Sequence, residues 1–162
     1  RAVLVTSWYF GLRKQEAAQL SSDMIVESRQ PNGSPVFTLR NDRLHQKNSA
    51  QRSLNPAARC ICDVPTSGDG QWPPELHWSC LCRQIKDLPK DPLCVSTLMS
   101  EIQSLGFQKF HGIRVSSALT VPQSAISPLI TAHFRWTDSV LWQTYLRDRH
   151  RVSRQTLPCW IV

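Results

Sequence analysis

The strongest constraint on this chain lies between His111 and Tyr145, where four side chains suited to phosphate chemistry follow in order. His111 and Arg114 form an H-x-x-R pair, Trp136 follows, and Tyr145 comes nine residues after that tryptophan. Because residues i and i+3 share one face of an α-helix, a helix here would point His111 and Arg114 into one site. The set indicates phosphate handling by a tyrosine nucleophile, although an H-x-x-R pair alone is common and a helical tyrosine often serves only packing.

A second motif lies near the start of the chain, in the segment FGLRKQEAAQLSSDMI. Gly11 interrupts the apolar run of residues 2–10, and the good helix formers of residues 12–20 follow it. Arg13 and Glu16 are three residues apart within that helical pattern. Considered alone, they would form an exposed i,i+3 ion pair that contributes little to stability.

Together the two stretches resemble the catalytic domain of tyrosine recombinases, the phage-integrase family. Those enzymes carry a G-L/M-R turn followed by x-x-E, and later an H-x-x-R helix, a His or Trp, and a tyrosine about nine residues further on. The resemblance implies that Tyr145 is the nucleophile and that Glu16 is a supporting acid. It also implies that the remaining catalytic side chains are Arg13, His111, Arg114 and Trp136.

The family places a catalytic lysine in a β-hairpin after the first motif. Lys47 is the prediction for that role, as the general acid that protonates the leaving 5′-oxygen. Arg43 and Lys14 are alternatives, because the hairpin varies in length and the sequence gives no firm register. An ordinary solvated loop lysine is the other interpretation of Lys47.

The resemblance implies site-specific DNA recombination or integration by tyrosine attack on a phosphodiester. The intermediate would be a covalent 3′-phosphotyrosyl bond, and the reaction would use no metal, ATP or other cofactor. A type IB topoisomerase that relaxes DNA is one alternative. A degenerate mobile-element remnant that binds DNA without cutting is another, favoured by two departures from the family pattern. Pro128 interrupts an expected helix, and Phe134 replaces a glycine at a position expected to need positive φ.

The predicted architecture is a single catalytic domain over residues 1–162, mainly α with a small antiparallel β-sheet, in the tyrosine recombinase fold. The chain has 162 residues, enough for one core, and opens at Arg1 without Met, so we expect an excised domain that lacks the family's N-terminal DNA-clamping domain. Its net charge of +7 comes mainly from arginine, whose planar fork matches phosphate oxygens. We therefore expect double-stranded DNA as the partner, and no membrane.

The tail, residues 146–162, is basic and then apolar. In many relatives such a tail docks on a neighbouring protomer, so a homotetramer on DNA with tail exchange is expected; packing on its own domain is the equal alternative. The Arg-, Trp- and Cys-rich texture resembles a eukaryotic mobile-element integrase, which implies a nuclear location. Otherwise the cytoplasm or nucleoid is expected.

Two C-x-C pairs, Cys60 with Cys62 and Cys80 with Cys82, lie about twenty residues apart. Zinc binding is one interpretation, but C-x-C is tighter than the usual structural-zinc spacing. We predict instead that these are mostly strand residues whose thiols do not form one cluster and bind no metal. Two such pairs could meet only if their strands lay side by side in register.

The remaining elements follow from periodicity and turn chemistry. Apolar residues at i, i+3, i+4 and i+7 predict a helix that starts at Asp91-Pro92 and ends at Gly106. The run 2–10 reads as a buried helix or a strand, and 77–85 as a strand or a short helix. Strands are predicted over residues 24–27, 36–39, 42–45 and 58–64.

Overall fold

The computed structural model describes residues 1–44, 55–63, 80–106, 108–121, 128–136 and 161. The α-helices are α1 (Ala2–Tyr9), α2 (Lys14–Ala18), α3 (Leu81–Gln84), α4 (Val95–Ser104), α5 (His111–Thr120) and α6 (Pro128–His133). The strands are β1 (Ile25–Arg29), β2 (Pro35–Leu39) and β3 (Ala57–Arg59). Short 3₁₀ turns are η1 (Ser22–Met24), η2 (Asn41–Arg43), η4 (Ile61–Asp63) and η6 (Ile85–Asp87). The described chain is thus mainly helical with one small antiparallel sheet, as the sequence predicted at this coarse level.

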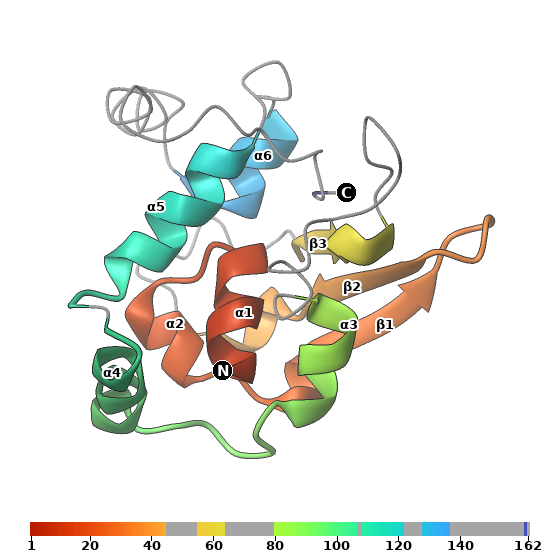
Figure 1. Cartoon of the computed structure of the whole chain (residues 1–162). Coiled ribbons are helices and arrows are strands. Elements are labelled where there is room, and N and C mark those ends of the chain that lie inside the picture. Colours follow the sequence, from red (N-terminus) through yellow and green to blue (C-terminus); the bar gives the residue numbers. More distant parts are fainter. Residues whose placement is uncertain (45–54, 64–79, 107, 122–127, 137–160, 162) are drawn as a thin grey trace.

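Helix α1 lies at the centre of the helical body (Figure 1). Its residues are buried on nearly every side, and it packs against α2, α3 and α5. A helix without a polar face is stable only when other elements surround it. That requirement explains why the apolar run near the N-terminus forms a helix and not a strand.

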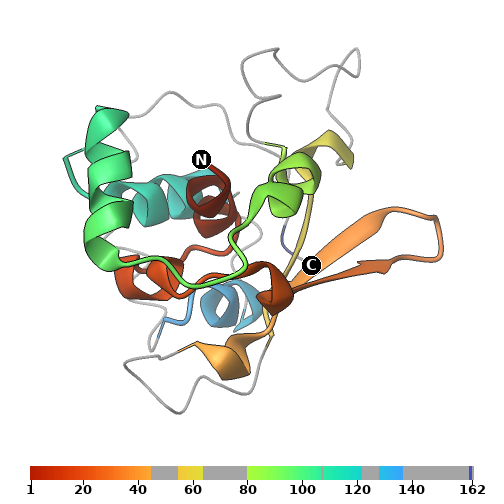
Figure 2. The same cartoon turned by 90° about the horizontal axis from the view of Figure 1, so that it is seen from below.

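The sheet has the order β1-β2-β3, and both pairs are antiparallel. Gly33 forms the tight turn between β1 and β2 with φ +87°, a conformation that favours glycine. In Figures 1 and 2 the β1–β2 hairpin projects away from the helices. Strand β2, the central strand, carries the buried side chains Val36, Phe37 and Leu39, which connect the sheet to the core.

The predicted strand over residues 42–45 is wrong where the structure describes it, because Asn41–Arg43 forms the 3₁₀ turn η2. The side-chain oxygen of Asn55 accepts the backbone N–H of Asn41, and Pro56 accepts that of Leu39. The Leu39 bond continues the pairing of β2 with β3 to the end of β2, and the Asn41 bond then holds the chain in the turn that replaces a further strand. Likewise β3 ends at Arg59, so only the first part of the predicted 58–64 strand is extended.

Helix α4 has the predicted periodicity, with Leu98 and Ile102 buried, and Gly106 follows its end with φ +84°. The helix begins at Val95, later than Asp91-Pro92 suggested. The backbone N–H of Leu93 donates to the carbonyl of Ala18 on α2, 2.7 Å away. That tertiary bond holds the preceding segment extended and delays the start of the helix.

The four cysteines of the C-x-C pairs contradict the prediction that they would stay apart. Their sulfur atoms all lie within 4.8 Å of one another. The prediction assumed strands, whereas Cys60 and Cys62 flank the start of η4, and Cys80 and Cys82 flank the start of α3. In each pair a helical turn, and not a strand register, brings the two thiols to one point.

The end of the chain contacts its own sheet. Ile161 forms an isolated antiparallel bridge with Ala58 of β3, and both residues are buried. The rest of the predicted tail, residues 146–160 and 162, lies outside the described residues. Within the described part of the chain, no helix combines the length and the apolar character needed to cross a membrane.

Candidate active site

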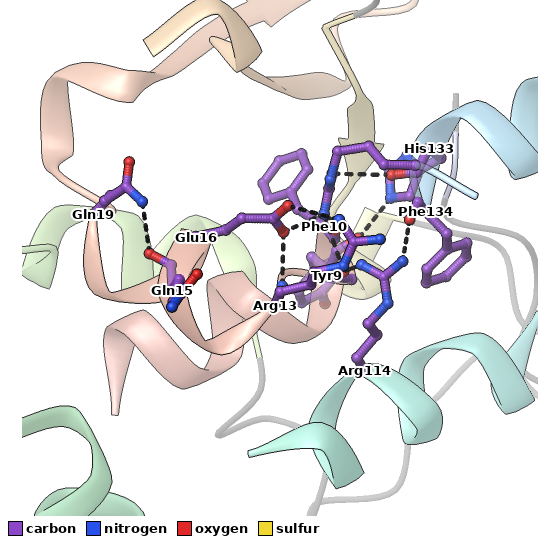
Figure 3. Close-up of polar contacts among 11 residues, drawn as sticks. Tyr9, Phe10, Arg13, Gln15, Glu16, Gln19, Arg114, His133 and Phe134 are labelled. Atoms are coloured by element: carbon purple, nitrogen blue, oxygen red, sulfur yellow. Dashed lines mark hydrogen bonds and ion pairs between the residues drawn. The ribbon is translucent and has the colours of Figure 1, made fainter. Parts of the chain in front are cut away.

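Helix α5 carries the H-x-x-R pair, as predicted. His111 is exposed at its first turn, whereas the Arg114 side chain is only 3% exposed. The Arg114 guanidinium donates to the carbonyl of Gly11, 2.5 Å away, and to the carbonyl of Phe134. Figure 3 shows it reaching from α5 towards Phe134 and the turn that follows α1. Arg114 therefore connects three segments that are distant in sequence.

The first motif forms the start of α2. Arg13 is extended at the N-cap position, and its backbone N–H donates to the Oε2 atom of Glu16 at 2.7 Å. This is the carboxylate half of a capping box, in which an acidic residue at the third helical position accepts the cap N–H. The Arg13 guanidinium lies 3.5 Å from Oε1 of Glu16 and is 38% exposed. Glu16 itself is buried, so this is not the exposed ion pair that the two residues alone would suggest.

Arg135 is a site residue that the sequence patterns did not reveal. It is 1% exposed, adopts φ +53°, and donates to the carbonyls of Phe10 and Gly11 and to Oε2 of Glu16. Its position directly before Trp136 was the only available signal. An internal arginine needs a buried acid, and Glu16 is the buried acid that pairs with it in the described part of the chain.

The Glu16 carboxylate is ionised in this cluster. Burial opposes ionisation, but the positive charge of Arg135, the N–H of Arg13 and the charge of Arg114 together lower the pKa of Glu16. Burial lowers the pKa of Arg135, but the charge and hydrogen bond of Glu16 oppose that shift, and the guanidinium stays protonated because arginine is not deprotonated in proteins. Glu16 thus connects the start of α2 to the segment after α6 and carries the negative charge that offsets Arg135.

Both departures from the family pattern have local explanations. Pro128 is the first residue of α6, where the missing N–H costs no helical hydrogen bond. The expected positive φ at Phe134 is wrong, since the left-handed residue is its neighbour Arg135. The Phe134 ring stacks on Trp136, with centroids 4.8 Å apart, and occupies the space beside Gly11.

Gly11 is required at the turn before Arg13. Its φ is +53°, and a Cβ built there would lie 2.3 Å from the Phe134 ring. The close approach of this backbone lets the Gly11 carbonyl accept from both Arg114 and Arg135. Gly11, the glycine that ends the apolar run, therefore provides the carbonyl that two arginines of the basic cluster share.

A pocket of about 440 Å³ opens over this cluster. Its lining includes the predicted site residues Arg13, His111, Arg114 and Trp136. It also includes two lysines: Lys14, which the sequence analysis gave as an alternative to Lys47, and Lys109, which the sequence patterns did not reveal. Its place two residues before His111 was the only signal for Lys109. The remaining lining residues are Leu12, Met99, Gln108 and Phe110.

The electrostatics of this pocket suit an anion with several oxygens. Arginine and lysine donors converge from α2, α5 and the segment before α5, and Trp136 adds an apolar wall. Guanidinium groups match phosphate oxygens bidentately, and charged donors strengthen such bonds. Lys47 and Tyr145, the predicted general acid and nucleophile, lie outside the described residues.

The buried residue His133 connects α6 to the end of α1, next to the site. His133, 2% exposed, donates from Nε2 to the Tyr9 carbonyl at 2.8 Å and stacks on Phe10. Burial, helped by the charges of Arg135 and Arg114, lowers the pKa of His133 to about 3. It is therefore neutral and structural, and it fixes the end of α6 against α1.

Comparison of this chain with protein-family models, curated proteins and solved structures finds no match. The site is therefore interpreted from its own residues.

Proposed function

We propose that this chain breaks and rejoins DNA strands through Tyr145, as a site-specific recombinase or integrase. One observation carries the proposal: Arg13 and Arg114, about a hundred residues apart in sequence, line one basic pocket together with His111. The order and spacing of the two motifs, which resemble those of tyrosine recombinases, support it further. The fitting substrate is a phosphodiester of double-stranded DNA.

Each residue type matches a step of that reaction. The Tyr145 oxygen attacks phosphorus, the bond to the 5′-oxygen breaks, and a 3′-phosphotyrosyl bond forms. Arg13 and Arg114 stabilise the charge that develops on the non-bridging oxygens. His111 donates a hydrogen bond or handles the tyrosine proton, and Lys47 protonates the departing 5′-oxygen.

The reaction is reversible without an energy source. A 5′-hydroxyl attacks the phosphotyrosyl bond, reforms a phosphodiester and releases Tyr145 with its proton. If the attacking hydroxyl belongs to another duplex, strands are exchanged. That exchange requires several copies on DNA, so a homotetramer and, for a eukaryotic mobile element, a nuclear location belong to the same proposal.

A DNA substrate nicked close to the scissile phosphate tests the proposal. After cleavage the short strand fragment that carries the free 5′-hydroxyl diffuses away. The covalent protein–DNA adduct therefore accumulates and appears as a shifted band on a denaturing gel. Tyr145→Phe should abolish the adduct and retain DNA binding. Arg13→Ala should reduce the adduct by at least about tenfold, because one phosphate-clamping charge is lost.

Arg29→Ala is the matched control, because Arg29 is an exposed arginine at the end of β1 and is not among the residues that line the basic pocket. It should leave adduct formation unchanged. An adduct that survives Tyr145→Phe would contradict the assignment of the nucleophile. Failure to form any adduct on a library of DNA sequences, with DNA binding intact, would contradict the cleavage reaction.

A second candidate function is DNA binding without cleavage. The favouring observation is that Arg114 is almost fully buried and donates to two main-chain carbonyls, a role it can have in a purely structural cluster. On this candidate the exposed basic side chains of the pocket hold a phosphate, and Tyr145→Phe changes nothing measurable. The same nicked substrate separates the two, because only the first candidate predicts an adduct.

A further inference from the structure

A second site lies apart from the basic pocket, where four cysteines from two distant segments converge. Cys60 is 3.1 Å from Cys62 and 3.4 Å from Cys80, measured between sulfur atoms. Cys62 is 3.6 Å from both Cys80 and Cys82, and Cys80 is 2.7 Å from Cys82. All four sulfurs lie within 4.8 Å of one another. We propose that Cys60, Cys62, Cys80 and Cys82 bind one Zn²⁺ ion as a structural Cys₄ site.

The distances fit that ion. Zinc–sulfur bonds are about 2.3 Å long, so the sulfurs of a regular tetrahedral site lie about 3.8 Å apart. Most of the separations measured here approach that value and need only small adjustments of the side chains. Four thiolates in tetrahedral arrangement are the donor set that zinc prefers. The site is also closed, since four protein ligands leave no position for a substrate, which is typical of a structural zinc.

The two halves of the site have the same local design. In each pair the first cysteine is buried, the residue between the cysteines is a buried aliphatic (Ile61 or Leu81), and the second cysteine is more exposed. In each pair the first cysteine directly precedes a helical turn, and the second lies within it. The aliphatic residue anchors the turn in the core while its neighbours present their thiols on one side. A repeated design of this kind indicates a binding site better than four cysteines packed merely as small hydrophobic residues.

Polar groups from the surrounding chain also face the sulfurs. The hydroxyl of Tyr9, on α1, accepts the backbone N–H of Ile61 at 3.2 Å and lies close enough to Cys60 for the thiol to raise the pKa of Tyr9, after burial itself. The backbone N–H of Arg83 donates to the carbonyl of Cys80, 3.3 Å away, and so holds the turn that carries Cys80 and Cys82. Donors to ligand sulfurs are the usual support of a thiolate metal site, because they spread its negative charge and orient the ligands.

The site would join the segment after β3 to the start of α3. Cys60 and Cys62 follow β3, Cys80 and Cys82 start α3, and α3 packs against α1. The hydrogen bond from Ile61 to Tyr9 also connects the site to α1, close in sequence to Gly11 and the basic cluster. Metal binding at this point would therefore stabilise the sheet, α3 and α1 as one unit.

Metal analysis of the purified full chain is the direct test. Protein expressed in zinc-supplemented medium should contain about one zinc ion per chain after extensive dialysis. A Cys62→Ser/Cys82→Ser variant, which changes only the two more exposed ligands, should lose the zinc. Cys94→Ser is the control, since Cys94 is exposed at the start of α4 and contacts Ser96 instead, so this variant should retain the metal.

A cobalt titration keeps the proposal testable if the double variant does not fold. Co²⁺ added to the metal-free wild type under reducing conditions should produce the near-ultraviolet charge-transfer band of thiolate ligands and the intense visible bands of tetrahedral cobalt. Zn²⁺ should then displace them at about one equivalent. Zinc-free protein that gives no such bands, or zinc that persists in a folded double variant, would overturn the proposal.

Two other outcomes would also overturn it. Iron in place of zinc in the purified protein would indicate a different thiolate centre. Disulfides would appear as a mass of the denatured, unreduced chain that is about two daltons lower per bond, with fewer titratable thiols and no bound metal. Neither result would affect the proposed DNA chemistry, which the nicked substrate tests separately.

Discussion

Glu16 and Arg135, 119 residues apart in sequence, form a buried ion pair with Oε2 and a guanidinium nitrogen 3.0 Å apart. The same Glu16 oxygen accepts the backbone N–H of Arg13, so one carboxylate connects the N-terminus of α2 to the segment after α6. Arg135 in turn donates to the carbonyls of Phe10 and Gly11. This pair therefore connects the segments that carry Arg13 and Trp136, two residues that line the basic pocket.

The first prediction concerns that pair. Glu16→Gln should lower the free energy of unfolding by about 3–5 kcal/mol, because it leaves the Arg135 charge buried without an opposite charge. Urea unfolding at pH 7 measures the change. Glu27→Gln is the control, since Glu27 is about half exposed and lies 3.7 Å from Arg29 in an exposed pair. It should cost less than about 1 kcal/mol, and equal losses in the two variants would refute a special role for Glu16.

The second prediction concerns pH. In the folded protein the pKa of His133 is lowered to about 3, whereas the ordinary value is 6.5. Below pH 6.5 the unfolded chain therefore binds a proton at this residue that the folded chain does not bind. Stability from this group is fully present above pH 6.5 and falls towards pH 3, by up to about 1.4 kcal/mol per pH unit.

Glu16 does not obscure this effect between pH 6.5 and 4.5. Its pKa is lowered from 4.5, so its contribution is present above 4.5 and is lost only at lower pH. His133→Gln, which keeps an N–H for the Tyr9 carbonyl but does not titrate, should remove that part of the slope. Urea unfolding at several pH values in this window compares the two proteins, and parallel pH profiles would contradict the prediction.

The third prediction concerns Gly11. Gly11→Ala should destabilise the fold by well over about 1 kcal/mol, because it combines positive φ with a contact of 2.3 Å to the Phe134 ring. That ring is buried and stacked on Trp136, so it has no room to move away. Gly33→Ala separates the two causes, since Gly33 also has positive φ but a Cβ added there would meet no atom within 4 Å. It should cost about 1 kcal/mol, measured by thermal unfolding, and a cost equal to that of Gly11→Ala would exclude the clash.

The fourth prediction concerns the general acid, which the proposed reaction needs because an alkoxide leaves poorly at neutral pH. Lys47→Ala should abolish cleavage of ordinary DNA and retain cleavage of DNA whose leaving 5′-oxygen is replaced by sulfur, which needs no protonation. The measurement is adduct formation on both substrates. Lys14→Ala is the informative comparison, because Lys14 lines the pocket and is the alternative acid. Rescue by sulfur in the Lys14 variant, and not in the Lys47 variant, would transfer the role to Lys14.

Local sequence patterns were sufficient for several elements. The periodic apolar residues of α4, the H-x-x-R spacing on α5 and the turn chemistry around Gly33 each act within a few residues. The coarse class, helices with a small antiparallel sheet, follows from such patterns. So does the expectation that Arg13 and Glu16 interact, because i,i+3 residues on a helix are neighbours.

Only the tertiary structure decided which of these features meet. The burial of Glu16 depends on Arg135, and the turn of Arg135 into its left-handed conformation depends on acceptors from Phe10 and Gly11. Likewise the approach of Cys60 to Cys80 depends on how the segment after β3 and helix α3 both contact α1, and no spacing along the chain encodes it. The sequence by itself determined the local elements and the types of side chain available for chemistry. The pairing of charges and thiols between distant segments came from packing, because burial makes an unpaired charge too costly and selects the arrangement that pairs it.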